Sequence, residues 1–160
     1  MAAPSFTARV EPVGQYLTDG YQSLFTFAAD PDVSFWEVTV KPPGAEGGDP
    51  IDTTTMHNSV WRTMALRQLK SLTEGSGTAA YDPQVLPQLT ALINVLTSCT
   101  VHNPDGSAWV FWGGLTQFDV DERSEGGFPL ANYTVTPTNM DPLGNEEGPI
   151  YVPPGSGTPS

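Results

Sequence analysis

Hydrophobic and polar residues alternate along several short stretches of the chain, a pattern typical of strands with one buried face. Residues 21–29 alternate in this way, and after a turn-forming Asp-Pro-Asp sequence residues 33–41 alternate again. The sequence therefore predicts that these two stretches pair as a β-hairpin. In the second stretch the apolar face has Trp36, Val38 and Val40, and the polar face has Glu37, Thr39 and Lys41.

Residues 42–55 contain prolines, glycines and acids without periodicity, which predicts a long loop. Such a long loop inside a compact domain usually has a function or is disordered. We expect strands to follow at about 58–64 and 71–81. This region contains the one local basic cluster of the chain, formed by Arg62, Arg67 and Lys70.

One amphipathic helix is expected at about 83–96, where leucine and isoleucine residues repeat at spacings of three and four. Asp82 is a plausible N-cap and Pro83 suits the first turn. The opposite face is polar, so we expect the helix to lie on a sheet.

A second hairpin is predicted around the turn sequence Asn-Pro-Asp-Gly at 103–106, which joins residues 97–102 to residues 107–118. A last strand is expected at about 129–136. The remainder is rich in proline and glycine and resembles an extended arm. The sequence thus predicts a β domain at 1–137 and a Pro/Gly-rich C-terminal arm at 138–160, which packs through Ile150 and Tyr151 or stays mobile.

Length and charge narrow the range of functions. The 160 residues suit one domain, and the formal net charge of −12 opposes binding to nucleic-acid phosphates or to an anionic membrane surface. We expect no membrane-spanning helix and no secretory signal, hence synthesis in the cytoplasm. The single cysteine, Cys99, cannot form an internal disulfide.

No motif for catalysis stands out. The two histidines, His57 and His102, and Cys99 offer no convincing nucleophile and base, and we expect no metal and no cofactor. The acidic stretch at 119–127 lacks the spacing of a calcium loop. Four tryptophans could form a sugar-stacking face, although a sheet core would use the same residues; they are Trp36, Trp61, Trp109 and Trp112.

The order of these motifs resembles the tail tube protein, or major tail protein, of long-tailed bacteriophages. The most similar parts are PPGAEGGDPIDTTTMHNSVWRT at 42–63 and EGGFPLANYTVTPTN at 125–139, and the resemblance spans about 15–140. It implies a mainly β (α+β) fold, a β-sandwich or partial barrel of antiparallel strands flanked by one helix. It also implies hexameric rings that stack into a hollow virion tube for DNA, with no enzymatic activity.

The resemblance assigns a role to the long loop, and within it we name two further sets of candidate residues from their charge and predicted strand positions. The loop at 42–55 would contact the adjacent ring, through Pro42, Pro43, Gly44, Glu46, Asp49, Pro50, Ile51 and Asp52. The cluster Arg62, Arg67 and Lys70 would pair with acids within or between subunits. Glu37, Asp119 and Asp121 would line the lumen and repel DNA, which is cargo and not a ligand.

The expected partners are further copies of the chain and other tail proteins, such as tape measure and end-capping proteins. Two alternatives stay open at this point. One is a carbohydrate-binding or adhesin β-sandwich module, and the other is a capsid decoration protein, which is also small, β-rich and acidic.

Overall fold

A single curled antiparallel sheet dominates the computed structural model, which describes residues 23–31, 33 and 35–154. The strand order is β1-β8-β9-β10-β7-β2, and β11 pairs with β9. The strands of this sheet are β1 (Leu24–Phe27), β2 (Trp36–Lys41), β7 (Gly75–Ala80), β8 (Thr97–His102), β9 (Ala108–Val120), β10 (Leu130–Pro137) and β11 (Ile150–Val152). One helix, α1 (Leu86–Leu92), lies against β9.

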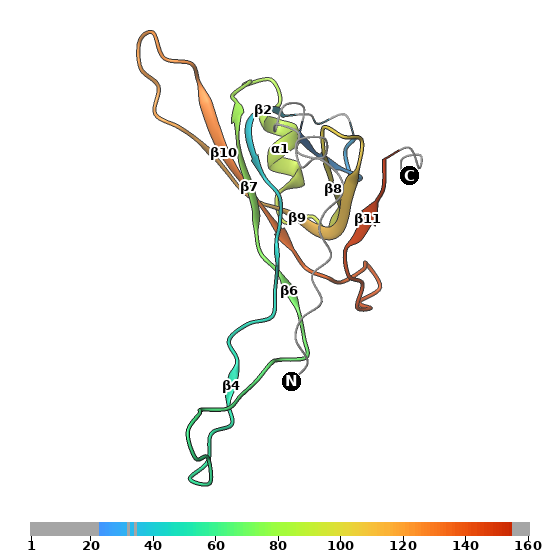
Figure 1. Cartoon of the computed structure of the whole chain (residues 1–160). Helices are drawn as coiled ribbons and strands as arrows, with labels where there is room; N and C mark the ends of the chain where they lie inside the picture. The colour runs from blue at the N-terminus through green and yellow to red at the C-terminus, as the bar shows by residue number, and fades with distance from the viewer. Residues whose placement is uncertain (1–22, 32, 34, 155–160) are drawn as a thin grey trace.

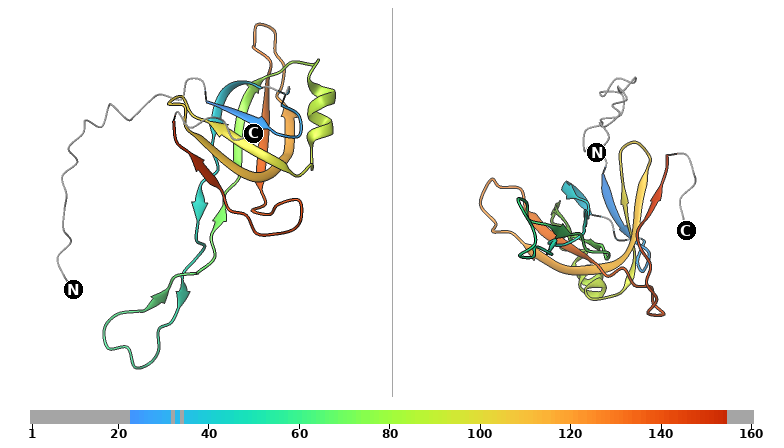
Figure 2. Two further views of the ribbon diagram at one scale, coloured as in Figure 1. Left: turned by 90° about the vertical axis from the view of Figure 1, so that its right-hand side faces the viewer. Right: turned by 60° about the horizontal axis from the view of Figure 1, so that its bottom comes forward.

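The long strand β9 gives the sheet its curl. Its first half pairs with β8 and β11, and its second half pairs with β10. The halves meet at Gly113, where an added Cβ would lie 2.5 Å from the backbone oxygen of Thr136. The outer strands β1 and β2 approach each other as the sheet curls, but they form no ladder (Figure 2). The predicted fold class is confirmed as mainly β with one short helix; of the two predicted architectures, β-sandwich or partial barrel, the chain has one large antiparallel sheet that curls without closing.

Aromatic side chains fill the interior of the curl. Phe35 stacks on Tyr133 with ring centroids 4.4 Å apart, and Phe25 meets Tyr133 edge-on at 5.7 Å. From α1, Leu89 and Leu92 complete this core. The alternating apolar residues of β1, β8, β9 and β10 are thus used for packing.

The helix is shorter than the sequence predicts. Residues 82–85 form a turn instead, in which Asp82 accepts a hydrogen bond from the Gln84 backbone N–H at 2.9 Å. The helix ends where Ile93 becomes extended and Asn94, with φ +63°, donates its N–H to the backbone oxygen of Leu115 at 2.9 Å. The hydrophobic period continues to residue 96 in the sequence, but docking of this end on β9 ends the helix at Leu92.

The predicted hairpin of residues 21–29 with 33–41 is wrong. The register pairs Phe25 with Val101 of β8, and β2 pairs with β7 at the other edge of the sheet. A local turn sequence cannot specify pairing when burial of an aromatic face favours a distant strand. The part of the prediction at residues 21 and 22 lies outside the described residues.

The predicted faces of β2 also differ from the structure. A register shift between Glu37 and Thr39 leaves Trp36 and Val38 exposed and places Glu37 half-buried. Such a bulge reverses the alternation, because one extra residue is inserted opposite the partner strand.

Residues 42–73 form a two-stranded projection, which we call the β-arm (Figure 1). In it β3 (Ala45–Glu46) pairs with β6 (Ser71–Leu72), and β4 (Ile51–Asp52) pairs with β5 (Met64–Ala65). The irregular loop predicted at 42–55 is therefore the outgoing half of a hairpin. The strand predicted at 58–64 is wrong except at its last residue, because residues 58–61 turn at the tip of the β-arm.

The second predicted hairpin and the last predicted strand are confirmed. Ala108 pairs with His102 across the turn, where Asn103 N–H donates to the backbone oxygen of Ser107 at 2.9 Å. Beyond β10, residues 138–149 turn back so that β11 joins the sheet beside β9. Within the described residues, no helix has the length and apolar character needed to cross a membrane.

Candidate assembly surfaces

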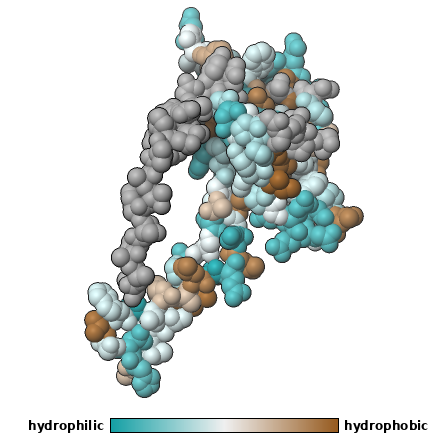
Figure 3. All heavy atoms as spheres, turned by 45° about the vertical axis from the view of Figure 1, so that its right-hand side comes forward, coloured by the Kyte–Doolittle hydropathy of each residue, from teal (hydrophilic) through white to brown (hydrophobic). Residues whose placement is uncertain are grey.

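The β-arm exposes large apolar side chains away from the core (Figure 3). Trp61 is 82% exposed and Leu66 is 83% exposed. Further exposed members are Ile51, Met56, Val60, Met64 and Leu69. Contiguous exposed apolar surface on a folded element marks an interaction site more often than chance exposure does.

Hydrogen bonds between the two halves of the β-arm and within its tip order its backbone. Near the tip, Thr53 N–H donates to the backbone oxygen of Thr63 at 2.9 Å, and Asn58 Oδ1 accepts from Thr55 N–H at 2.8 Å. At the root, Gly44 N–H donates to Thr73 Oγ1 at 2.8 Å. The β-arm is therefore a structured element, and only Leu72 at its root packs against the core, while the apolar side chains named above stay exposed.

The predicted basic cluster lies on the returning half of the β-arm. Arg62 Nη1 approaches Asp52 Oδ2 at 3.9 Å, an exposed ion pair, and Arg67 Nε donates to the backbone oxygen of Asp49 at 2.8 Å. An exposed pair of this kind contributes little to stability. The hydrogen bond from Thr54 lowers the pKa of Asp52, so this carboxylate stays charged near neutral pH.

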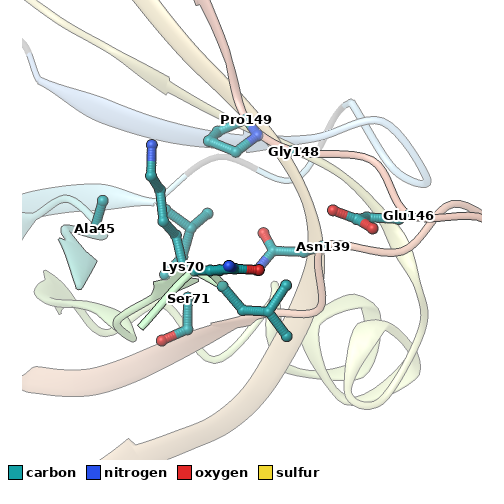
Figure 4. A pocket seen from close by; sticks show the side chains of 10 residues that line it. Ala45, Lys70, Ser71, Asn139, Glu146, Gly148 and Pro149 are labelled. Atoms are coloured by element: carbon teal, nitrogen blue, oxygen red, sulfur yellow. The ribbon is translucent and has the colours of Figure 1, made fainter. Parts of the chain in front are cut away.

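A hollow of about 300 Å³ lies between the root of the β-arm and the C-terminal segment (Figure 4). Lys70 and Leu72 line it from the β-arm, and Asn139, Glu146 and Pro149 line it from the C-terminal segment. The two segments, far apart in sequence, therefore share one surface.

A second surface lies at the β9–β10 hairpin, which contains the predicted lumen acids Asp119 and Asp121. Asp121 Oδ1 accepts a hydrogen bond from Asn132 Nδ2 at 2.7 Å, and Asp119 accepts one from Gln117. The one cation of this tip, Arg123, lies over the Tyr81 ring at 4.8 Å.

The third predicted lumen acid, Glu37, lies at the seam between β1 and β2. Its Oε1 accepts a hydrogen bond from the Phe25 backbone N–H at 3.0 Å. Burial raises the pKa of Glu37, and the bond from Phe25 opposes that rise. A lumenal role for these three acids stays a prediction.

Residues that could carry chemistry are dispersed. Cys99 is buried, and burial raises the pKa of its thiol to about 12. His102 Nε2 lies 3.1 Å from Thr26 Oγ1 and not beside the thiol. In the described part of the chain, no group of three or more His, Cys, Asp or Glu side chains could hold a metal ion.

The four tryptophans do not form one stacking face. Trp61 lies on the β-arm and Trp36 on β2, while Trp109 packs partly on the core. Trp112 lies on the opposite face of β9 and donates its indole N–H to Glu147 Oε2 at 2.8 Å. The arrangement gives no support to a sugar-binding surface built from these residues.

The returning half of the β-arm is a candidate contact surface that the sequence pattern did not predict. The available signal was a run from Thr53 to Thr73 that contains several large apolar residues and no acid. The apolar residues of this run repeat neither every two residues, as in a strand, nor every 3.6 residues, as in a helix. The pattern therefore could not distinguish an exposed hairpin from irregular core strands.

No protein-family model matches the chain, and no curated protein matches it. Among solved structures, a chain of the virion of a native gene transfer agent particle is similar, with a TM-score of 0.58 and 14% identity over 76% of this chain and 95% of that one. A chain from the tail of an empty gene transfer agent particle, refined with C6 symmetry, gives a TM-score of 0.56 at 14% identity over 76% and 95%. A chain of the sixfold-symmetrised baseplate of an anti-feeding prophage gives 0.52 at 10% identity over 86% and 94%.

The chain shares its fold with phage-tail-type proteins. Since most of this chain and almost the whole length of each similar chain are covered, the likeness extends over most of the fold and not over one motif. This agrees with the resemblance noted from the sequence.

Proposed function

We propose that this chain is a structural, non-enzymatic tail protein whose copies form hexameric rings, and that the rings stack into a hollow virion tube. The observation that carries the proposal is the β-arm, an ordered projection that exposes Trp61, Leu66 and Leu69 to solvent. Keeping such a surface exposed is unfavourable for a monomer, and a second copy would bury it.

The open sheet supports lateral association. Strands β1 and β2 end the sheet, and in the described residues neither has a second strand partner. Unpaired edges of this kind can join sheets of identical chains into a ring. The sixfold symmetry of the similar tail and baseplate particles supports rings of six.

The charge supports passage of DNA without binding. With a net charge of −12, the tube would repel phosphates, and Glu37, Asp119 and Asp121 are our candidates for the lumen. The partners under this proposal are other copies, a tape measure protein and end-capping proteins, all within the virion and none in a membrane.

The test compares assembly of the wild type with two β-arm variants by sedimentation and negative-stain electron microscopy. In the first variant, Asn-Gly replaces residues 47–70, which closes the β3–β6 ladder because Glu46 pairs with Ser71. The second is Trp61→Ser/Leu66→Ser/Leu69→Ser. The control Leu143→Ser removes an 86% exposed side chain outside the β-arm.

We expect hollow rods from the wild type and from the control, and folded, unstacked species from both β-arm variants. Circular dichroism checks that the variants keep their fold. Rods from the variant without residues 47–70, or a wild type that never assembles, would contradict the proposal.

A further inference from the structure

The β-arm and the β9–β10 hairpin leave opposite ends of the same strands. At one end of the sheet, Trp36 pairs with Ala80 and Ala80 with Leu130, and the β9–β10 connection follows directly. At the other end, Lys41 pairs with Ser76, and the β-arm continues from there. Figure 1 shows the two projections pointing away from each other. Neither can therefore fold back on the other within one chain.

The two projections differ in charge. The β-arm as a whole has no net charge, because the three acids of its outgoing half balance the three cations of its returning half. The acids are Glu46, Asp49 and Asp52, whereas from Thr53 to Thr73 the chain has the cations Arg62, Arg67 and Lys70 and no acid. The tip of the β9–β10 hairpin, residues 119–125, has four acids and one cation, Arg123. Because Arg123 already contacts the Tyr81 ring, it screens the nearby carboxylates only in part. Of the four acids at this tip, Asp119 and Asp121 accept side-chain hydrogen bonds. Glu122 and Glu125 are exposed, and their carboxylates make no hydrogen bond within the described residues.

Both projections also present apolar surface. At the foot of the acidic hairpin an open hollow of about 1110 Å³ is lined by Trp36, Val38 and Phe128. Trp36 is 71% exposed and Phe128 is 69% exposed. The β-arm thus combines cations with exposed apolar side chains, and the opposite end combines acids with the same kind of surface.

We propose that the β-arm of one copy docks head to tail on the acidic end of a second copy, with Arg62 and Lys70 facing Glu122 and Glu125 and Trp61 facing the hollow beside Trp36 and Phe128. This inference rests on the proposed function and names the surface that receives the β-arm. A contact between two different surfaces of identical chains does not close on itself as a twofold dimer does, so it propagates along an axis. Two acidic hairpin tips would repel each other, which disfavours a stack in which these ends meet.

A charge swap tests the contact. Arg62→Glu/Lys70→Glu reverses two cations on the returning half of the β-arm, and Glu122→Lys/Glu125→Lys reverses two acids of the hairpin. The combination of all four leaves the net charge of the chain unchanged. Each of these side chains is exposed, so the fold should be kept. Gln88→Lys, which adds a positive charge at an exposed position of α1 outside both projections, serves as control.

We expect each reversal to raise the critical concentration for stacking by about tenfold at low salt, and the combination to restore it. A second measurement is proximity: Ser59→Cys/Ser124→Cys treated with a short bismaleimide should give a ladder of linked chains, since buried Cys99 does not react.

The outcomes separate the two proposals. If the wild type forms rods but hairpin reversal has no effect, or the combination stays defective and no ladder forms, then the β-arm docks elsewhere and this inference is overturned while the tube stands. A wild type that forms no rods overturns both.

Discussion

The Phe25 backbone N–H donates to Glu37 Oε1 at 3.0 Å across the seam where β1 and β2 meet without a ladder. A side chain thus takes the place of a strand-to-strand hydrogen bond and holds the two edges of the curled sheet together. The sheet stays open at this seam, where one side chain bridges the two edge strands.

Removing this acceptor should loosen the seam. Glu37→Leu leaves the Phe25 N–H without its partner, and we expect the free energy of unfolding to fall by about 1–3 kcal/mol. Glu37→Gln keeps an oxygen at the same place and should lose much less. Urea unfolding of both variants checks this, and equal losses would show that the hydrogen bond does not stabilise the fold.

The half-buried carboxyl of Glu37 should also make the stability of the fold depend on pH. Since burial raises its pKa, the folded chain keeps a proton on this carboxyl at pH values where the unfolded chain has already released it. The contribution of Glu37 to stability is therefore fully present at low pH and falls as pH rises through that window. We expect the thermal midpoint of the wild type, relative to Glu37→Gln, to rise as pH is lowered from about 7 to about 4. A constant difference would contradict the shift.

Gly77 should tolerate no side chain. A Cβ there would lie 2.5 Å from the backbone oxygen of Thr39 and still closer to the Tyr133 hydroxyl, so Gly77→Ala should lower the free energy of unfolding by about 2–4 kcal/mol. Gly47→Ala meets nothing within 4 Å and should stay within about 0.5 kcal/mol of the wild type. Similar thermal midpoints for the two variants would show that β2 and Tyr133 shift freely.

The bond from the Trp112 indole to Glu147 should anchor the C-terminal segment. Glu147→Ala removes the acceptor 2.8 Å from Nε1 and should cost about 1 kcal/mol, with faster hydrogen exchange at β11. Glu147→Gln keeps an acceptor and is the control. Unchanged exchange at residues 150–152 in Glu147→Ala would mean that pairing with β9 alone holds β11.

Cys99 should be inert in the folded protein. Its burial and a thiol pKa of about 12 predict no reaction with iodoacetamide at pH about 8, and full reaction in denaturant. Mass spectrometry reads the outcome, and rapid labelling of the native chain would show that β8 opens easily.

Local signals predicted the elements that depend on neighbours in sequence. The turn at 103–106 and the alternation of β8, β9 and β10 identify the central hairpin and its neighbouring strand because their partners are close or their faces are strongly apolar. The helix was recognised from Leu89 and Leu92, although its docking on β9 shortens it.

Long-range pairing could not be predicted in this way. Phe25 pairs with Val101 rather than with β2, because the gain comes from burying an aromatic face in a core assembled from distant strands. The bulge at Val38 reverses the faces of β2 without any glycine to signal it. The sequence pattern predicts a loop where the outgoing half of the β-arm lies, since each of its ladders is only two residues long.

The most direct test of the tube proposal is the symmetry of the assembled wild type, seen in end-on class averages of the concentrated protein. We predict hollow, sixfold rings that stack into rods. A particle that stays a 17.1 kDa monomer at every concentration and ionic strength, or that closes as a twofold dimer, would contradict it.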